Sequence, residues 1–182
     1  MSERPSVVVV DTIFGRYHAF AGDLITTQLK RYGAHTRNEL AMLRHFIRPG
    51  DTILDVGAHI GTFSIPLAFS AGGEGKVYAF EPNVLAFELL VENVKANDLE
   101  MRVGCQNLVV SHSNEHYRCS AINVQNTGAT AYRRISECEV DPERAECSQR
   151  SVSLDTWYTD HAVQEAIDVL KIDTEGMELD VL

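Results

Sequence analysis

Glycines and acids follow two apolar segments in a spacing that suits the binding of a nucleoside. The segment 52–56 leads into a turn that contains Gly57 and Gly61. The next apolar segment along the chain ends on Glu81. A glycine turn between a strand and a helix lets backbone approach a ligand at the positive end of the helix, and an acid at the tip of the next strand can accept two hydrogen bonds from ribose hydroxyls. These residues predict a nucleoside-binding site.

The spacing of the glycines narrows the class of nucleoside. A dinucleotide site requires G-x-G-x-x-G, whose middle glycine allows a pyrophosphate to sit on the turn. Here the pattern that begins at Asp55 is D-x-G-x-x-x-G, with Ala58 and His59 inside the turn. No pyrophosphate cradle is evident, so a nicotinamide-dependent oxidoreductase is disfavoured. A plain structural glycine turn is the remaining alternative at this point.

Longer motifs connect the chain to one family. The motif D-V-G-A-H-I-G-T-F-S begins at Asp55, A-F-E-P-N begins at Ala79, and K-I-D-T-E-G-M-E begins at Lys171. In this order and spacing the chain, from about residue 36 to its end, is similar to the FkbM-type S-adenosylmethionine-dependent methyltransferases. The resemblance implies a Rossmann-like α/β fold with a doubly wound, mostly parallel sheet and with S-adenosylmethionine as cofactor. It also implies O-methylation of a hydroxyl on a small molecule, sugar or polyketide.

Cofactor roles follow from the strand ends and from the resemblance. Glu81 is expected to bind ribose, and Asp55 to brace the glycine turn or to reach the methionine amino group. Asn107 stands where related enzymes hold adenine, with an asparagine turn as the alternative. Glu39 has the position of an acid that closes over the cofactor, or is a solvent-facing helix residue. The predicted cofactor-binding residues are Glu39, Asp55, Gly57, Ala58, His59, Gly61, Glu81, Pro82, Asn83, Asn107, Leu108 and Asp173.

The predicted catalytic residues are the acids that follow the apolar segment 168–172. Methyl transfer from a sulfonium needs little acid–base chemistry beyond deprotonation of the hydroxyl, so positioning does most of the work. A general base must reach that hydroxyl, and Asp173 and Glu175 are the best placed candidates. Alternatively, Asp173 caps the next helix and Glu175 orders the loop. His59, which replaces an asparagine common in the family, is a weaker base candidate.

Strand and helix patterns alternate along the part of the chain that carries these motifs. We expect residues 1–34 to form an N-terminal extension with a strand at 7–11, and residues 35–182 to form the methyltransferase domain with a β-rich insertion at 115–154. Apolar spacing predicts helices over 38–46, 62–71 and 84–96 and strands over 52–56, 76–80, 101–106 and 168–172.

The chain ends inside the helix expected after strand 168–172, so the C-terminal strands of the family's sheet are predicted to be missing. Strand 168–172 would then be an open edge that carries Val169 and Leu170, and self-association through this edge is expected. The missing strands also leave a second interpretation open. In that interpretation the chain is a cofactor-binding or interaction module without turnover.

Charge and composition limit the partners. The chain has 16 basic and 26 acidic residues, a net charge of −10, which repels phosphate backbones and membrane surfaces at long range. We therefore expect a small hydroxylated acceptor, no nucleic acid and no membrane. The four cysteines form no C-x-x-C pair, which favours free thiols in a reducing cytoplasm. His112 and His116 flank a turn, and no metal site is predicted.

Overall fold

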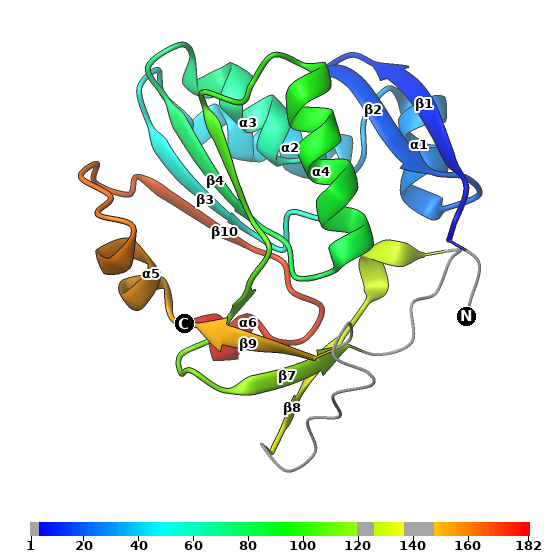
Figure 1. The fold of residues 1–182 in the computed structure, drawn as a ribbon. Helices are drawn as coiled ribbons and strands as arrows, with labels where there is room; N and C mark the ends of the chain where they lie inside the picture. The colour runs from blue at the N-terminus through cyan, green and yellow to red at the C-terminus, as the bar shows by residue number, and fades with distance from the viewer. Residues whose placement is uncertain (1–3, 120–125, 137–147) are drawn as a thin grey trace.

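A computed structural model describes residues 4–119, 126–136 and 148–182 (Figure 1). Within these ranges the chain forms a four-stranded parallel sheet, an N-terminal β-hairpin and a second four-stranded sheet. Helices pack against the parallel sheet, and none of the helices in these ranges is long and apolar enough to cross a membrane. Cys138 and Cys147 lie outside the described residues, so the predicted free thiols stay a prediction.

The parallel sheet has the connectivity of a doubly wound fold. Its strands are β3 (Thr52–Val56), β4 (Lys76–Phe80), β5 (Val103–Gln106) and β10 (Val169–Ile172). Among the described residues their order is β10-β3-β4-β5, with β10 at one edge. Within this sheet the chain passes first through β3, then through β4 and β5 toward one edge, and afterwards crosses back to β10 on the other side of β3. The direction of winding therefore reverses between β3 and β10. Ligands of such sheets bind beside this reversal. The predicted Rossmann-like α/β fold is confirmed.

Both faces of the sheet are covered, as the burial of every residue of β3 requires. Ile53 and Val77 pack into a core with α3 (Ser64–Ala71) and α4 (Val84–Ala96). Leu54 points the other way and packs with Trp157 of α5 (Leu154–Asp160), which lies on the opposite side of the sheet from α3 and α4 (Figure 1). No helix is predicted at α5, because a helix this short shows too few apolar repeats.

The predicted bounds of β4 and α4 match the structure, and a cap explains the start of the helix. Asn83 Oδ1 accepts hydrogen bonds from Leu85 N at 3.0 Å and from Ala86 N at 3.4 Å. These bonds satisfy two donors of the first helical turn. The helix predicted over 62–71 begins later, at Ser64, because the glycine turn extends to Phe63.

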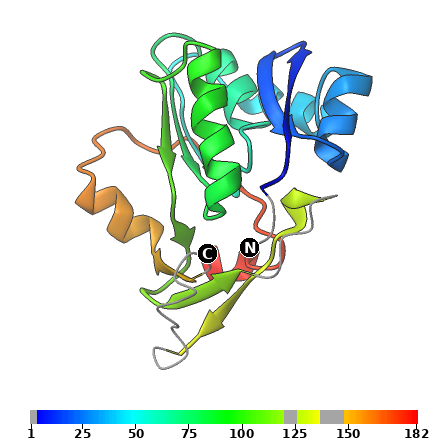
Figure 2. The ribbon, with the colours of Figure 1, turned by 45° about the vertical axis from the view of Figure 1, so that its right-hand side comes forward.

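The N-terminal extension forms a hairpin that packs beside α4 and a helix that packs against the hairpin (Figure 2). Strands β1 (Val7–Thr12) and β2 (Gly15–Phe20) pair antiparallel, and α1 (Leu24–Tyr32) and α2 (Arg37–Phe46) follow. Buried Asn93 of α4 connects the hairpin to the glycine turn. Its Nδ2 donates to His18 O at 3.0 Å and to Ile60 O at 2.9 Å, and its Oδ1 accepts from His18 N at 2.6 Å.

The segment predicted as a β-rich insertion holds short strands that form a layer below the parallel sheet in Figure 1. These are β7 (His116–Cys119), β8 (Tyr132–Ile135) and β9 (Ser148–Val152), and β6 (Val109–Val110) pairs with β9. A 3₁₀ turn, η1 (Thr127–Ala129), precedes β8. After β10 the chain forms a loop and α6 (Glu178–Val181). This loop and η1 contribute walls of the candidate site.

Candidate active site

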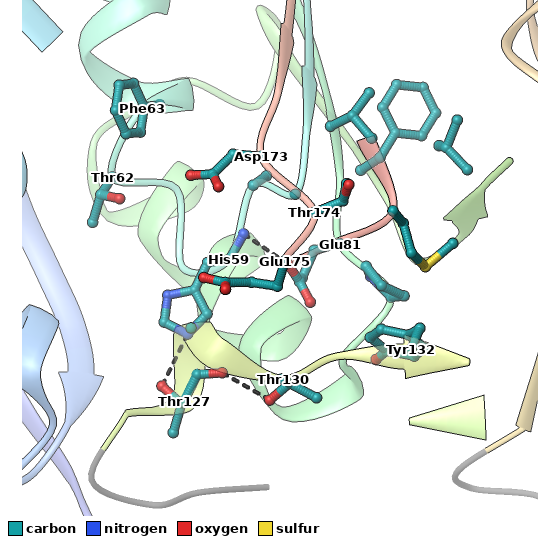
Figure 3. A pocket seen from close by; sticks show the side chains of 18 of the residues that line it. His59, Thr62, Phe63, Glu81, Thr127, Thr130, Tyr132, Asp173, Thr174 and Glu175 are labelled. Atoms are coloured by element: carbon teal, nitrogen blue, oxygen red, sulfur yellow. Dashed lines mark hydrogen bonds between the residues drawn. The ribbon is translucent and has the colours of Figure 1, made fainter. Parts of the chain in front are cut away.

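The carboxyl ends of β3, β4 and β10 open onto one pocket of about 250 Å³ (Figure 3). The pocket therefore lies at the reversal of the sheet, where open α/β sheets bind ligands. The glycine turn forms one wall and the end of β4 another. Further walls come from α1, from η1 and from the loop after β10. The predicted residues that line the pocket are Gly57, Ala58, His59, Glu81, Pro82, Leu108, Asp173 and Glu175.

The glycine turn is held by the neighbouring strands. Gly57 N and Ala58 N both donate to Phe80 O at the end of β4, at 3.0 and 2.9 Å. Gly57 has φ 81°, and a Cβ atom at this position would overlap the carbonyl oxygen of Asp173. Glycine is therefore required here by the close approach of the loop after β10, and this packing brings the ends of β3, β4 and β10 together.

Glu81 is buried at the centre of the pocket wall. Its Oε2 accepts from His59 N at 2.8 Å and its Oε1 from Asn83 N at 2.7 Å. Burial raises the pKa of Glu81 to about 7, against the opposing effect of these two backbone hydrogen bonds. A carboxylate has about four acceptor positions, so both oxygens can still accept hydrogen bonds from a ligand.

Asp55 braces the glycine turn from beneath and does not line the pocket. Its Oδ2 accepts from Ser64 Oγ at 2.6 Å, and its Oδ1 forms an ion pair with Lys171 Nζ at 3.0 Å. Lys171 also donates to Gly57 O at 3.0 Å. Of the two roles predicted for Asp55, the structure thus provides the bracing contacts. Lys171 itself lines the pocket, although the sequence identifies it only as part of a motif.

His59 belongs to a chain of hydrogen bonds that links distant segments. Its Nε2 lies 2.9 Å from Thr127 Oγ1, and Thr127 Oγ1 donates to Asp23 Oδ2 at 2.5 Å. Thr127 N donates to the same oxygen at 2.8 Å. Burial lowers the pKa of His59 to about 4, so the imidazole is neutral at neutral pH. Asp23 also serves as the N-cap of α1, through a bond from Ile25 N at 2.6 Å.

Asp173 and Glu175 lie in the loop after β10 and face the pocket, as predicted. Burial and the neighbouring carboxylate of Asp173 raise the pKa of Glu175. A different residue, Glu178, orders this loop. Its Oε1 accepts hydrogen bonds from Thr174 N at 3.0 Å and from Gly176 N at 3.2 Å. The residue at the N-cap of α6 is Met177. Glu178 thus orders the loop, and Asp173 does not stand at the N-cap of α6.

The other predicted residues lie outside the pocket wall. Glu39 lies on α2 and lines a separate depression with Gln28 and Arg37. Gly61 closes the turn through its N–H, which donates to Ala58 O at 2.9 Å. Asn83 caps α4, and Asn107 Nδ2 donates to Glu81 O at 2.8 Å and to Pro82 O at 3.1 Å. The Asn107 amide thus holds the residues that follow β4 in place.

Several pocket residues were not predicted. His35 follows α1, and its Nδ1 lies 2.9 Å from Gln28 Oε1. Leu24 and Ile25 come from the N-terminal extension, and Met177 comes from the loop after β10. Met177 lies in the motif that begins at Lys171, and the segment N-T-G-A-T at 126–130 contributes Asn126, Thr127, Gly128 and Thr130 to the pocket wall. No group of three or more His, Cys, Asp or Glu side chains in the described part of the chain could hold a metal ion.

Comparisons with known proteins identify the domain. A family model described as the methyltransferase FkbM domain matches residues 55–182. A ribosomal protein L11 methyltransferase of Thermosipho melanesiensis is 35% identical over 79 residues, which is 42% of this chain and 30% of that protein. A tRNA(Phe) (4-demethylwyosine(37)-C(7)) aminocarboxypropyltransferase of Pyrococcus horikoshii is 36% identical over 61 residues, or 34% of this chain and 21% of that protein. The chain spans less than a third of the length of these relatives.

Solved structures show a similar partial match. Pyrococcus horikoshii TYW2 in complex with MeSAdo shares 24% sequence identity with a TM-score of 0.45, and the match covers 57% of this chain and 36% of that chain.

The comparisons correct the expectation about nucleic acid. The net charge of −10 predicts that nucleic acid is not a partner, and this prediction is wrong, because the Pyrococcus horikoshii relative is named for its action on tRNA(Phe). Net charge sums over the whole surface, whereas contact with a phosphate backbone depends on where basic residues gather.

Proposed function

We propose that this chain, which belongs to the FkbM methyltransferase family, binds S-adenosylmethionine in the pocket and transfers its methyl group to a hydroxyl oxygen of an acceptor. One observation carries the proposal. The glycine turn, the buried carboxylate of Glu81 and the acids that follow β10 converge on a single pocket at the reversal of the sheet. The first two features suit a nucleoside, and the acids suit deprotonation of an acceptor.

The pocket fits the cofactor in its chemistry. Glu81 would bind the ribose hydroxyls, since both its oxygens keep acceptor positions. Phe80, Pro82 and Leu108 provide an apolar end for adenine. The turn from Gly57 to His59 would lie beside the methionine part. S-adenosylmethionine, when bound, supplies a methyl group on a sulfonium whose leaving thioether is neutral.

The acids after β10 would receive the proton of the acceptor hydroxyl. A general base works best when its pKa lies near the working pH. Burial and the charge of Asp173 raise the pKa of Glu175, which makes its carboxylate a better proton acceptor than an ordinary glutamate. Asp173, 4.0 Å from Lys171 Nζ, is then placed to orient the hydroxyl. The family resemblance supports oxygen as the methylated atom.

Calorimetry with S-adenosylmethionine, S-adenosylhomocysteine and NAD tests the cofactor assignment. We expect both adenosyl compounds to bind and NAD not to bind. Transfer of a labelled methyl group is then measured on hydroxylated sugars, macrolides, tRNA and ribosomal protein, since the relatives are named for the last two. Binding of NAD alone would refute the cofactor assignment. Cofactor binding without transfer to any acceptor would favour the second candidate, a binding module without turnover.

A further inference from the structure

One polar atom of the pocket remains to be explained after these assignments. Among the described residues, Nδ1 of His59 is buried and has no hydrogen-bond partner. The ring lines the pocket, and its other nitrogen is bound to Thr127 (Figure 3). A buried polar atom without a partner is costly. In a binding pocket, such an atom points to a group that the ligand supplies.

The hydrogen-bond chain fixes what kind of group this is. Both oxygens of Asp23 accept backbone N–H bonds, and an ionised carboxylate can only accept, so the Thr127 hydroxyl donates to it. Thr127 Oγ1 has then used its hydrogen and must accept from His59 Nε2–H. It follows from this network that Nδ1 carries the lone pair. His59 therefore needs a donor from the ligand.

The cofactor of the proposed function has one strong donor near this position. Its methionine part, beside the glycine turn, carries a sulfonium, a carboxylate and an α-ammonium group, and only the ammonium can donate. We infer that His59 Nδ1 accepts a hydrogen bond from this α-ammonium group, with Thr127 and Asp23 as positioning residues that hold the ring and its tautomer. The inference rests on the proposed function.

Charge and burial agree with this assignment. The low pKa of His59 keeps the ring neutral, so it accepts a cationic donor without charge repulsion. The carboxylate of Asp23 lies at the far end of the hydrogen-bond chain that runs through Thr127 to His59, and its charge polarises each of these hydrogen bonds. Asp55, the acid first considered for the amino group, is fully buried and occupied by Ser64 and Lys171. The remaining rival is Asp173, whose side chain is 63% exposed.

The inference also gives the N-terminal extension a role in binding. Asp23 lies before the segment 55–182 that matches the family model, yet it sets the tautomer of a residue inside that segment. The extension is thus part of the cofactor site of this chain, since Leu24 and Ile25 line the pocket and Asp23 bonds to Thr127 of η1.

Paired ligands separate this role from a structural one. We would measure the affinity of the wild type for S-adenosylhomocysteine and for its analogue in which hydrogen replaces the α-amino group. We expect the amine to improve binding by about tenfold to a hundredfold, the range for a hydrogen bond to a charged group. Glycine tolerates the φ of 50° at position 59, so His59→Gly should keep the backbone conformation. In this variant the ratio of the two affinities should fall to a few fold at most, while the analogue binds as before. A merely structural change would weaken both ligands equally.

Thr127 supplies the matched variants. Thr127→Val removes the hydroxyl that fixes the tautomer and should lower the ratio, whereas Thr127→Ser keeps the hydroxyl and should restore it. Nitrogen-15 spectra of the imidazole should show the Nε2–H tautomer and a shift of Nδ1 on addition of S-adenosylhomocysteine, with little shift for the analogue. An unchanged ratio in His59→Gly, or loss of the ratio in Asp173→Asn alone, would overturn the inference. Failure of the wild type to bind either adenosyl ligand would instead refute the proposed function, and the inference with it.

Discussion

Lys171 of β10 forms a buried ion pair with Asp55 of β3, with 3.0 Å between Nζ and Oδ1. The two side chains are 11% and 0% exposed, and the residues are register partners in the sheet. Because Lys171 also binds Gly57 O, the pair connects the edge strand to the glycine turn. Buried pairs contribute little net stability, but removal of one partner leaves the other charge uncompensated.

The first prediction concerns this pair. Lys171→Met should lower the free energy of unfolding by about 3 to 5 kcal/mol, the range for a buried charge that loses its partner. Urea denaturation measures the change as a shift in midpoint at constant slope. Lys95→Met, at an exposed position of α4, is the control and should change stability by less than about 0.5 kcal/mol. Equal effects of the two variants would contradict the prediction.

The second prediction concerns the glycine turn. Gly57→Ala should destabilise the fold by more than about 2 kcal/mol, because the new Cβ overlaps Asp173 O and a non-glycine residue is strained at φ 81°. Gly73→Ala is the control, since a Cβ there meets nothing within 4 Å. Thermal unfolding of both variants tests this. If Gly57→Ala is as stable as the wild type, the glycine is not needed to join the strands.

The third prediction concerns the ribose assignment of Glu81. Glu81→Ala should weaken S-adenosylhomocysteine binding by about 1.5 to 3 kcal/mol, the range for loss of hydrogen bonds to a charged group. Calorimetry measures the change. Glu88 is an exposed acid on α4, and the control variant Glu88→Ala should bind the ligand as the wild type does. Unchanged affinity in Glu81→Ala would remove the ribose assignment.

The fourth prediction concerns pH. The folded-state pKa of Glu81, about 7, is raised above its ordinary value near 4.5, so the folded state holds this proton more tightly. Its contribution to stability is therefore full below pH 4.5 and is lost as the pH rises through about 7. His59 acts in the opposite sense, since its lowered pKa makes stability fall as the pH drops from 6.5 toward 4.

The effects of Glu81 and His59 on the pH dependence of stability have opposite signs and partly cancel in the wild type. Single variants are therefore needed to measure each of them. The stability of Glu81→Gln relative to the wild type should rise between pH 4.5 and 7. The wild type loses stability in this range as Glu81 ionises, whereas glutamine does not titrate. Denaturation midpoints across this range provide the measurement, with Glu88→Gln as the control. A constant difference between Glu81→Gln and wild type would show that Glu81 does not titrate in this window.

The fifth prediction concerns catalysis. On an accepted substrate, Asp173→Asn and Glu175→Gln should lower turnover more than they lower cofactor affinity, with a loss on the order of a hundredfold for the residue that acts as base. Steady-state rates and calorimetry on the same preparations separate the two effects. Glu100→Gln, at an exposed position remote from the pocket, is the control. Full turnover in both pocket variants would place the base elsewhere.

Local signals explain which parts of this structure were predictable. β4 and α4 follow from an apolar segment, the cap residue Asn83 and helical spacing, all contained within 21 residues of sequence. The convergence of the glycine turn and Glu81 follows from the topology of parallel strands. The bond between Asp23 and Thr127 joins residues 104 positions apart, and no local pattern encodes it. Glu39 illustrates the reverse: its helix was predicted, but its side chain faces a separate depression.

The contact between the hairpin and α4 has a consequence for biosynthesis. β2 leaves the ribosome before α4, because Asn93, its partner on α4, follows His18 by 75 residues. At roughly 5 to 20 residues per second, the hairpin waits about 4 to 15 s for the helix on which it docks. An isolated two-stranded hairpin is marginally stable in water. The N-terminal extension is therefore synthesised before α4 but becomes ordered only after α4 has emerged.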